Sequence, residues 1–309
     1  MDIRAFMPSE EECALVLRDV RWRWGVICPR CESRLVVRHG RHLWVYQRYL
    51  CKGCGRHFND RTGTQFEDSK LPLRMWFFAA FLMQYKVSIK EISKTAHISY
   101  PTAFKIAKTL RRGLYLSQLQ EKLKGIVELD EVYVTAGLKG KHGLKRPPRV
   151  RGLRVRGRGT YATDKPPITG MVERGGTVRL TSSTNMTGRV VLRRVMNYIH
   201  EEAEALYTDD YPAYNVLDGF CNHETVNHSL GQYARDGDIH TNTVEAEFSV
   251  FRPWMATYRG ISKENLYLYC AQYNFLRNTR EEDRARRAAA IAISHLANIE
   301  EEPCIISLI

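Results

Sequence analysis

Two pairs of cysteines, each with two residues between its members, constrain the fold of this chain more than any other feature. The pairs are Cys28/Cys31 and Cys51/Cys54, and 19 residues separate them. This is the spacing of a four-cysteine zinc site, in which each pair forms a tight turn. Four unrelated buried cysteines are the alternative, which the paired spacing disfavours. Because four thiolates leave no coordination position open, we expect a structural Zn²⁺ ion.

The segment between the pairs predicts a basic hairpin. Leu35 to Tyr49 mixes Val, Trp and Tyr with basic residues, a pattern typical of two short strands. The basic side chains are either phosphate contacts or a solvated face; they are Arg38, Arg41, His42 and Arg48. We expect residues 1–66 to form a zinc ribbon with an N-terminal helix.

The overall charge favours a polyanionic partner. The 309 residues contain 47 Lys and Arg against 34 Asp and Glu, a formal net charge of +13. Nucleic acid is the leading partner for such a chain, and its length predicts two or three domains. The longest apolar stretch, residues 75–83, falls short of the roughly 20 residues of a membrane span. No secretion signal opens the sequence. We therefore expect an intracellular protein with no membrane partner.

A helix, a turn and a second helix are predicted after the ribbon. Residues 72–85 are apolar over a helical length, and residues 88–112 show a helical pattern that breaks between His97 and Pro101. Pro101 suits the start of the new helix. The pair is either a DNA-binding helix-turn-helix, which we expect over 67–118, or an ordinary packing unit. The candidate DNA contacts on the second helix include Lys105, Lys108 and Arg111.

Acidic residues stand out in a short apolar segment, Gly125 to Val134. Alternation along a strand puts Glu128 and Asp130 on one face and Glu131 on the other. Ionised carboxylates among Ile, Val and Leu are costly to bury. A bound divalent metal is an economical explanation for them.

A second strand is predicted to end at an acid. The segment that begins at Ala205 reaches Asp209 and Asp210, and Pro212 prevents further pairing. An Asp at a strand end is also an ordinary turn residue. Asp209 alone therefore leaves both interpretations open.

A helix that begins near His240 carries the third acid. Asn242 and Glu245 have the spacing of a capping box, so Glu245 is either a cap or a functional carboxylate. Arg252 lies seven residues beyond Glu245, nearly two turns, so both side chains share a face. Pro253 follows Arg252 and puts the continuation of the helix in question.

Taken in order, these motifs resemble the DDE transposases of zinc-ribbon insertion sequences over roughly residues 20 to 280. The segments that carry the resemblance are Arg61–Thr64, Glu128–Glu131, Tyr207–Asp209, Val226–Ser229 and His240–Glu245.

The resemblance implies an α/β fold: a ribonuclease-H-like mixed sheet with flanking helices, expected over residues 119–285. In such a core the first Asp lies on the opening strand, the second after the fourth strand and the third acid on a later helix. The implied triad is Asp130, Asp209 and Glu245, with Asn242 or Glu247 as a possible replacement for Glu245. Two Mg²⁺ or Mn²⁺ ions held by these carboxylates would activate a water or a 3′ hydroxyl.

The resemblance also implies contacts with DNA beyond the triad. Arg252 falls where such enzymes usually carry Lys. The histidines at 228 and 240 either orient water or contact phosphate, or are structural. A basic insertion, residues 137–160, is expected as a cationic loop that reaches DNA. The residues expected to contact DNA are Arg252, His228, His240, Asn242, Lys139, Lys141, Lys145, Arg149, Arg151 and Arg154.

After the insertion, Ile168 to Val172 and Thr177 to Thr181 predict a hairpin of the core sheet. Residues 286–309 are expected as a C-terminal tail.

The sequence thus predicts a transposase that binds element ends in double-stranded DNA, cleaves at their 3′ ends and joins them to target DNA. A homodimer or larger assembly, located with the nucleoid in a prokaryotic cytoplasm, is expected. Two alternatives stay open: a zinc-ribbon DNA-binding regulator whose catalytic domain is inactive, and a structure-specific nuclease that does not join strands.

Overall fold

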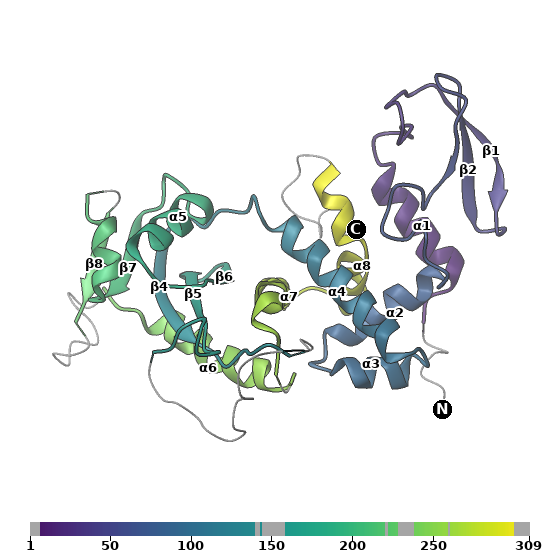
Figure 1. Cartoon of the computed structure of the whole chain (residues 1–309). Helices are drawn as coiled ribbons and strands as arrows, with labels where there is room; N and C mark the ends of the chain where they lie inside the picture. Colours follow the sequence, from purple (N-terminus) through teal and green to yellow (C-terminus); the bar gives the residue numbers. More distant parts are fainter. Residues whose placement is uncertain are drawn as a thin grey trace. The chain divides into compact units, whose positions relative to one another are not determined.

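The computed structural model describes residues 7–139, 143, 158–219, 222–227, 238–258 and 260–299. The chain divides into two compact units (Figure 1). One, the ribbon unit, comprises residues 1–118 and 281–309, and the other, the sheet unit, comprises residues 119–280. Several basic residues expected to contact DNA lie outside the described residues: Lys141, Lys145, Arg149, Arg151, Arg154 and His228.

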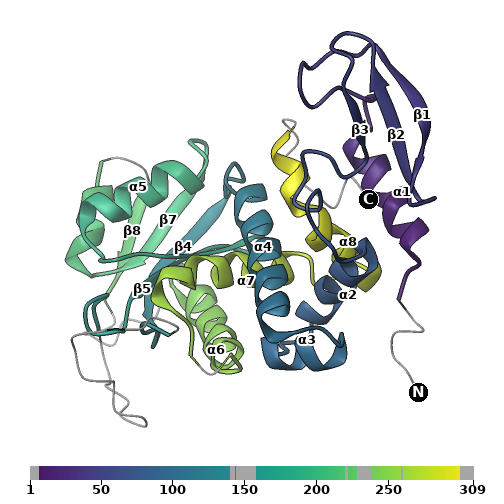
Figure 2. The ribbon, with the colours of Figure 1, turned by 45° about the vertical axis from the view of Figure 1, so that its right-hand side comes forward.

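The ribbon unit begins with a capped helix and a small sheet. α1 (Glu10–Arg21) is capped by Ser9, whose side chain accepts a hydrogen bond from the amide of Glu12. The Glu12 carboxylate in turn accepts a hydrogen bond from the amide of Ser9. β1 (Val36–His42), β2 (Tyr46–Cys51) and β3 (His57–Asn59) follow as an antiparallel sheet in that order (Figure 2). The predicted hairpin is therefore present, with a third strand beside it.

A buried carboxylate ties α1 to this sheet. Asp60 is fully buried and forms an ion pair with Arg18 at 2.8 Å. Its carboxylate also accepts hydrogen bonds from the amide of Gln47 and the hydroxyl of Tyr49. Because these partners satisfy both oxygens, the charge can be buried without a large cost.

Helices complete the ribbon unit. α2 (Leu73–Met83), α3 (Ile89–Thr95) and α4 (Tyr100–Ser117) occupy the predicted helical region. Ser99 caps α4 by accepting from the amide of Thr102. α8 (Arg284–Ile293) packs against α2 and α4, and η5 (Ser294–Ile299) packs against α4. Residues 284–299 therefore pack against the helices of the ribbon unit.

The sheet unit is built on a five-stranded mixed sheet in the order β6-β5-β4-β7-β8 (Figure 1). β4 is antiparallel to β5 and parallel to β7, β5 is antiparallel to β6, and β7 is parallel to β8. The strands are β4 (Ile126–Tyr133), β5 (Pro167–Glu173), β6 (Val178–Ser182), β7 (Ala205–Asp209) and β8 (His223–Val226). The sheet opens on β4, which carries Asp130, and its fourth strand in sequence, β7, ends at Asp209. The expected ribonuclease-H-like fold is confirmed.

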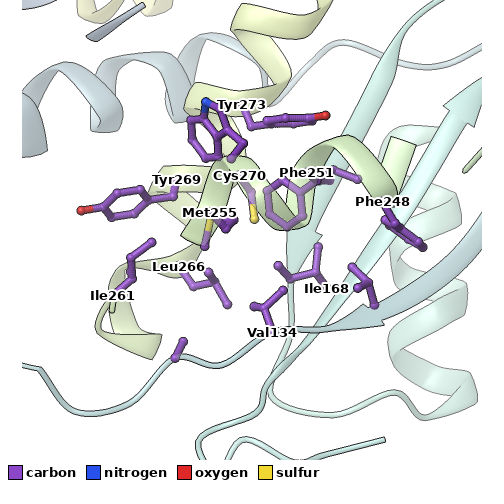
Figure 3. Close-up of a cluster of buried hydrophobic side chains, with 14 of the residues drawn as sticks. Val134, Ile168, Phe248, Phe251, Met255, Ile261, Leu266, Tyr269, Cys270 and Tyr273 are labelled. Atoms are coloured by element: carbon purple, nitrogen blue, oxygen red, sulfur yellow. The ribbon is translucent and has the colours of Figure 1, made fainter. Parts of the chain in front are cut away.

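Helices cover both faces of this sheet. α5 (Gly188–Tyr198) and η2 (Pro212–Leu217) pack on the face to which Val127 and Leu129 of β4 point. α6 (Asn242–Ala256) and α7 (Leu266–Asn278), with η4 (Lys263–Asn265) before α7, pack on the face of Val132 and Val134 (Figure 3). Alternation along β4 therefore supplies two separate apolar cores.

Pro253 does not end α6, which continues to Ala256. A proline inside a helix removes one hydrogen bond. The buried side of α6 carries Phe248, Phe251 and Trp254, which pack into the core shared with α7. Figure 3 shows Phe248 and Phe251 in that core. This packing offsets the missing bond.

Among the described residues, no helix has both the length and the apolar character required to cross a membrane.

Candidate active site

The register of two parallel strands brings the first two acids together. Leu129 of β4 lies opposite Thr208 of β7, so the next residues along the two strands are Asp130 and Asp209. Both side chains point to the face that α6 covers, because they are two residues beyond the paired Glu128 and Tyr207. The end of β7 therefore brings Asp209 beside Asp130 of β4.

A third carboxylate joins this pair. Oxygen atoms of Asp130, Glu131 and Asp209 all lie within 4.8 Å of one another. The amide of Glu131 donates to Asp130 Oδ1 at 2.7 Å, and the amide of Tyr211 donates to Asp209 Oδ1 at 3.1 Å. We call these three acids the carboxylate cluster. Hard oxygen ligands at this spacing suit a divalent cation such as Mg²⁺.

The electrostatics of the carboxylate cluster also fit a cation. Burial, together with the negative charges of Glu131, Asp209 and Glu245, raises the pKa of Asp130 from its ordinary value of 3.8 to about 8. Like charges this close disfavour simultaneous ionisation. A bound divalent ion would remove that repulsion and allow all of the acids to be ionised.

Glu131 is a member of the site that the sequence did not indicate. It lies on the opposite face from Asp130, as alternation predicts, and accepts a 2.7 Å hydrogen bond from the hydroxyl of Tyr214. Burial raises the pKa of Glu131, while the bond from Tyr214 acts in the opposite sense. Because β7 ends at Asp209, however, side chains from both faces of β4 can reach this point. Alternation alone gives no signal for this convergence.

Arg158 is a second residue that the sequence did not indicate. Its guanidinium lies 3.3 Å from the Glu131 carboxylate and 3.8 Å from the ring centre of Tyr211. The side chain remains more than half exposed. The end of the basic insertion therefore brings a positive charge directly to the carboxylate cluster.

The third acid of the expected triad is near this cluster but outside it. Glu245 is exposed in the first turn of α6, and its negative charge contributes to the raised pKa of Asp130. Its oxygens are not among the group within 4.8 Å. Asn242, one of the two expected replacements, is also exposed at the start of the helix.

Glu247, the other expected replacement, points elsewhere. It is buried and forms an ion pair with Arg277 of α7 at 2.9 Å. It also accepts a hydrogen bond from the hydroxyl of Tyr273. These partners direct Glu247 into the α6–α7 core, so Glu245 is the better placed of the two acids.

The start of α6 is capped by a carboxylate from β4. The residue before the helix, Thr241, makes no capping bond with its side chain. Glu128 instead accepts from the amides of Thr243 and Val244 at 2.7 and 3.1 Å, and from the Thr243 hydroxyl at 2.7 Å. The helix start is thus stabilised without a capping role for Glu245.

An arginine completes this connection. Arg174 donates to Glu128 at 2.7 Å and also bonds to Asp238 and to His240. The His240 ring nitrogen lies 3.2 Å from Glu128. Glu128 and Arg174 therefore connect the start of α6 to β4, and the His240 ring contacts both of these side chains.

The other expected DNA contacts are distributed over both units. Arg252 is exposed on α6, on the face that carries Glu245. Lys139 is exposed, and its ammonium donates to the carbonyl of Gly260 at 3.1 Å. In the ribbon unit, Lys105 and Lys108 are exposed on α4.

Arg111 differs from the expectation, because it is only 2% exposed. It lies four residues after Ala107 and three before Leu114, both buried, so helical periodicity puts it on the packed face of α4. This position does not present its guanidinium to a ligand outside the ribbon unit.

The four cysteines form a second cluster of ligand atoms. The sulfurs of Cys28, Cys31, Cys51 and Cys54 all lie within 4.8 Å of one another, with Cys28–Cys54 at 3.7 Å and Cys31–Cys51 at 3.6 Å. Zn–S bonds of about 2.3 Å in a tetrahedron place sulfurs about 3.8 Å apart. The predicted thiolate shell therefore fits a tetrahedral zinc ion.

Comparisons with known proteins agree on one family. Residues 122–278 match the ISXO2-like transposase domain, and residues 8–57 match a transposase zinc-ribbon domain. A protein of Halobacterium salinarum, described as an uncharacterized protein in transposable element ISH50, is 39% identical over 280 residues, which cover 90% of this chain and 93% of that protein.

Solved structures show a weaker likeness. The Mos1 transposase paired-end complex with left transposon end has 12% sequence identity and a TM-score of 0.21, over 60% of this chain and 74% of that chain. The Mos1 strand transfer complex has 12% identity and a TM-score of 0.21, over 60% and 73% of the two chains.

Proposed function

Because the chain belongs to the ISXO2-like transposase family, we propose that it binds the ends of an insertion sequence and catalyses metal-dependent cleavage and joining of DNA strands. The observation that carries this proposal is the meeting of Asp130, Glu131 and Asp209 where the pairing of β4 with β7 ends. Like-charge crowding of this kind is costly for a fold, and it is understandable as a cation site.

The residues that would hold the catalytic ions are Asp130, Asp209 and Glu245. When bound, a pair of Mg²⁺ or Mn²⁺ ions would lower the pKa of an attacking water or 3′ hydroxyl and neutralise charge on the leaving oxygen. Asp130 would keep a proton at neutral pH until a cation arrives, since its pKa is about 8. Cation binding would then displace this proton from the Asp130 carboxyl.

Exposed basic side chains would position the DNA. Arg252 shares a face with Glu245 and would grip a phosphate beside the carboxylate cluster. Arg158 lies at the other side of the cluster, against Glu131. In the ribbon unit, a zinc ion held by the four cysteines would stabilise the fold, and Lys105 and Lys108 of α4 would bind the DNA backbone.

Two ends of an element must be brought together before they are joined to a target. We therefore propose that a homodimer or larger assembly forms on double-stranded DNA, with the nucleoid of a prokaryotic cytoplasm as its location.

A cleavage assay tests this proposal. The full chain is incubated with end-labelled DNA from both borders of its own gene, together with an unlabelled target and Mg²⁺ or Mn²⁺. We expect nicks at the 3′ ends of the element and joined products in the wild type, and neither with Asp130→Asn. Asp210→Asn, an exposed neighbour outside the carboxylate cluster, should behave as the wild type.

The two competing functions give other outcomes in the same assay. Binding without metal-dependent cleavage would contradict the enzyme and support a DNA-binding regulator. Cleavage without joined products would support a nuclease.

A further inference from the structure

The tip of the β1–β2 hairpin exposes two large apolar side chains. Leu43 is 64% exposed and Trp44 is 87% exposed. Both residues have positive φ angles, 50° and 62°, a left-handed conformation that bulky L-residues rarely adopt. Turns of this kind usually contain Asn or Gly. The hairpin therefore exposes an apolar tip to solvent and pays a conformational cost for its backbone. Strained backbone of this kind is found more often at functional sites than in structural turns.

The hairpin segment that carries this tip is basic, although Glu11 of α1 lies 3.9 Å from Arg41. From Ser33 to Phe58 there are six Lys and Arg residues and three His, and neither Asp nor Glu. Every residue of β1 after Val36 is exposed. Arg41 lies directly beside the tip, since its guanidinium donates to the carbonyl of Trp44 at 3.3 Å.

We propose that this tip is a DNA wedge: the basic hairpin contacts phosphates of a duplex, and Leu43 and Trp44 enter the base stack. A two-stranded ribbon fits a DNA groove, and apolar side chains that enter a base step partly unstack it. The proposal goes beyond the metal-dependent chemistry of the sheet unit, and it rests on the proposed function only in taking DNA as the partner.

Charge complementarity selects DNA over a protein partner. A tip that contacted a second copy of this chain would need acids or an apolar patch opposite it, whereas the residues of the hairpin itself carry only positive charge on either side of one apolar point. Phosphates on either side of an opened base step match that pattern.

Binding measurements on the zinc-loaded full chain test the wedge. The probe is a short mixed-sequence duplex with a fluorescent label, titrated at several salt concentrations without added divalent ions, so that no cleavage occurs. Trp44→Ala should weaken binding about tenfold, since stacking on one aromatic ring contributes about 1–3 kcal/mol per base. The dependence of affinity on salt should stay unchanged, because no charge is lost.

Two variants serve as controls. Trp24→Ala removes another exposed tryptophan of the same unit, 57% exposed and outside the hairpin, and should leave the affinity unchanged. Arg38→Gln should lower the slope of log affinity against log salt by about one, the signature of a lost phosphate contact. One zinc per chain in each variant confirms that the ribbon is folded.

A second readout reports the wedge directly. The same duplex with 2-aminopurine in place of an adenine should become more fluorescent with the wild type and with Trp44→Phe, but not with Trp44→Ala. Unchanged affinity and unchanged 2-aminopurine signal for Trp44→Ala would overturn the wedge. The wedge would also be overturned if Trp44→Ala lost self-association while its affinity for DNA stayed unchanged. That result would assign the tip to a protein contact. A wild type that binds no DNA at all would instead contradict the proposed function.

Discussion

The two clusters of ligand atoms in this protein are assembled in opposite ways. The four cysteines come from a segment that starts at Cys28 and ends at Cys54, and two local turns bring their sulfurs together. The carboxylates of Asp130 and Asp209 are far apart in sequence and meet only because β4 and β7 pair in parallel. The first site is a local structure, and the second depends on the fold of the whole sheet unit.

The difference extends to energetics. A closed shell of four thiolates is incomplete without its ion, so metal binding and folding of the ribbon are one process. In the carboxylate cluster the sheet unit holds the acids together whether or not a cation is bound, and burial and the neighbouring negative charges raise the pKa of Asp130. The ribbon should therefore need its metal to fold, while the sheet unit should need its metal only to act.

The largest effect is expected on removal of zinc. Cys51→Ser or a strong chelator should unfold the ribbon sheet, because a structural zinc site contributes about 10–16 kcal/mol of binding free energy. Hydrogen exchange of the full chain should lose protection in β1 and β2 and keep it in β4 and β5. Equal loss of protection in both units would break the comparison, since the sheet unit would then depend on the same metal.

Asp130→Asn should have the next largest effect, and it should have two opposite consequences. Loss of a carboxylate that binds the catalytic ions removes several kcal/mol of transition-state stabilisation, so cleavage should fall by about a thousandfold or more. Without metal, the folded chain must keep a proton on Asp130 at neutral pH, whereas the unfolded chain releases it. Asn removes this cost, so metal-free thermal stability at neutral pH should rise. Asp210→Asn is the matched control for both measurements. A lower melting temperature for Asp130→Asn would contradict the electrostatic account.

Glu128→Gln tests the connection between β4 and α6. The variant keeps the shape of the side chain but leaves the charge of Arg174 without its 2.7 Å partner. Loss of a residue that orients metal ligands typically lowers activity 10–100-fold. We expect this decrease in kcat. The variant should also require more Mg²⁺, and its KM for DNA should be unchanged.

The control is Glu121→Gln, which breaks an ion pair with Arg179 that involves neither β4 nor α6. If it reduces kcat as much as Glu128→Gln does, the role of Glu128 is general stability and not the placement of Glu245.

A dependence on pH is the last expected effect, and it is the smallest when taken over a change of one pH unit. The pKa of Asp130 is raised from 3.8 to about 8, so between these values the folded chain binds a proton that the unfolded chain has released. Metal-free stability should therefore fall as pH rises through this window, by up to about 1.4 kcal/mol per unit. Mn²⁺ affinity, measured by calorimetry, should rise up to about tenfold per unit and level off near pH 8. A flat profile from pH 5 to 8 would show that no proton is displaced.

Much of the fold could be predicted from the sequence because its signals are local. The paired cysteines, the alternation in β4 and the turn between β5 and β6 each act over a few residues. The same signals put Asp130 on one predicted strand and Asp209 at the end of another. Arg111 was also open to a local prediction, since its spacing from Ala107 and Leu114 assigns it to the buried face of α4.

The remaining features depend on contacts that no local pattern encodes. Glu128 caps a helix that begins more than a hundred residues later, and only the packed fold brings the two together. Glu131 reaches the carboxylate cluster from the opposite face because the neighbouring strand, β7, ends at Asp209. Arg158 follows a basic segment with little periodicity, so nothing in the sequence singled it out from its neighbours.

The central claim is that Asp130 of β4 and Asp209 of β7, with Glu245, hold the catalytic ions. Anomalous diffraction from crystals of the full chain with Mn²⁺ and element-end DNA tests it most directly. The account predicts two Mn²⁺ peaks about 4 Å apart, with Asp130 bound to both and Asp209 and Glu245 each bound to one. The absence of Mn²⁺ between Asp130 and Asp209 in such crystals would contradict it.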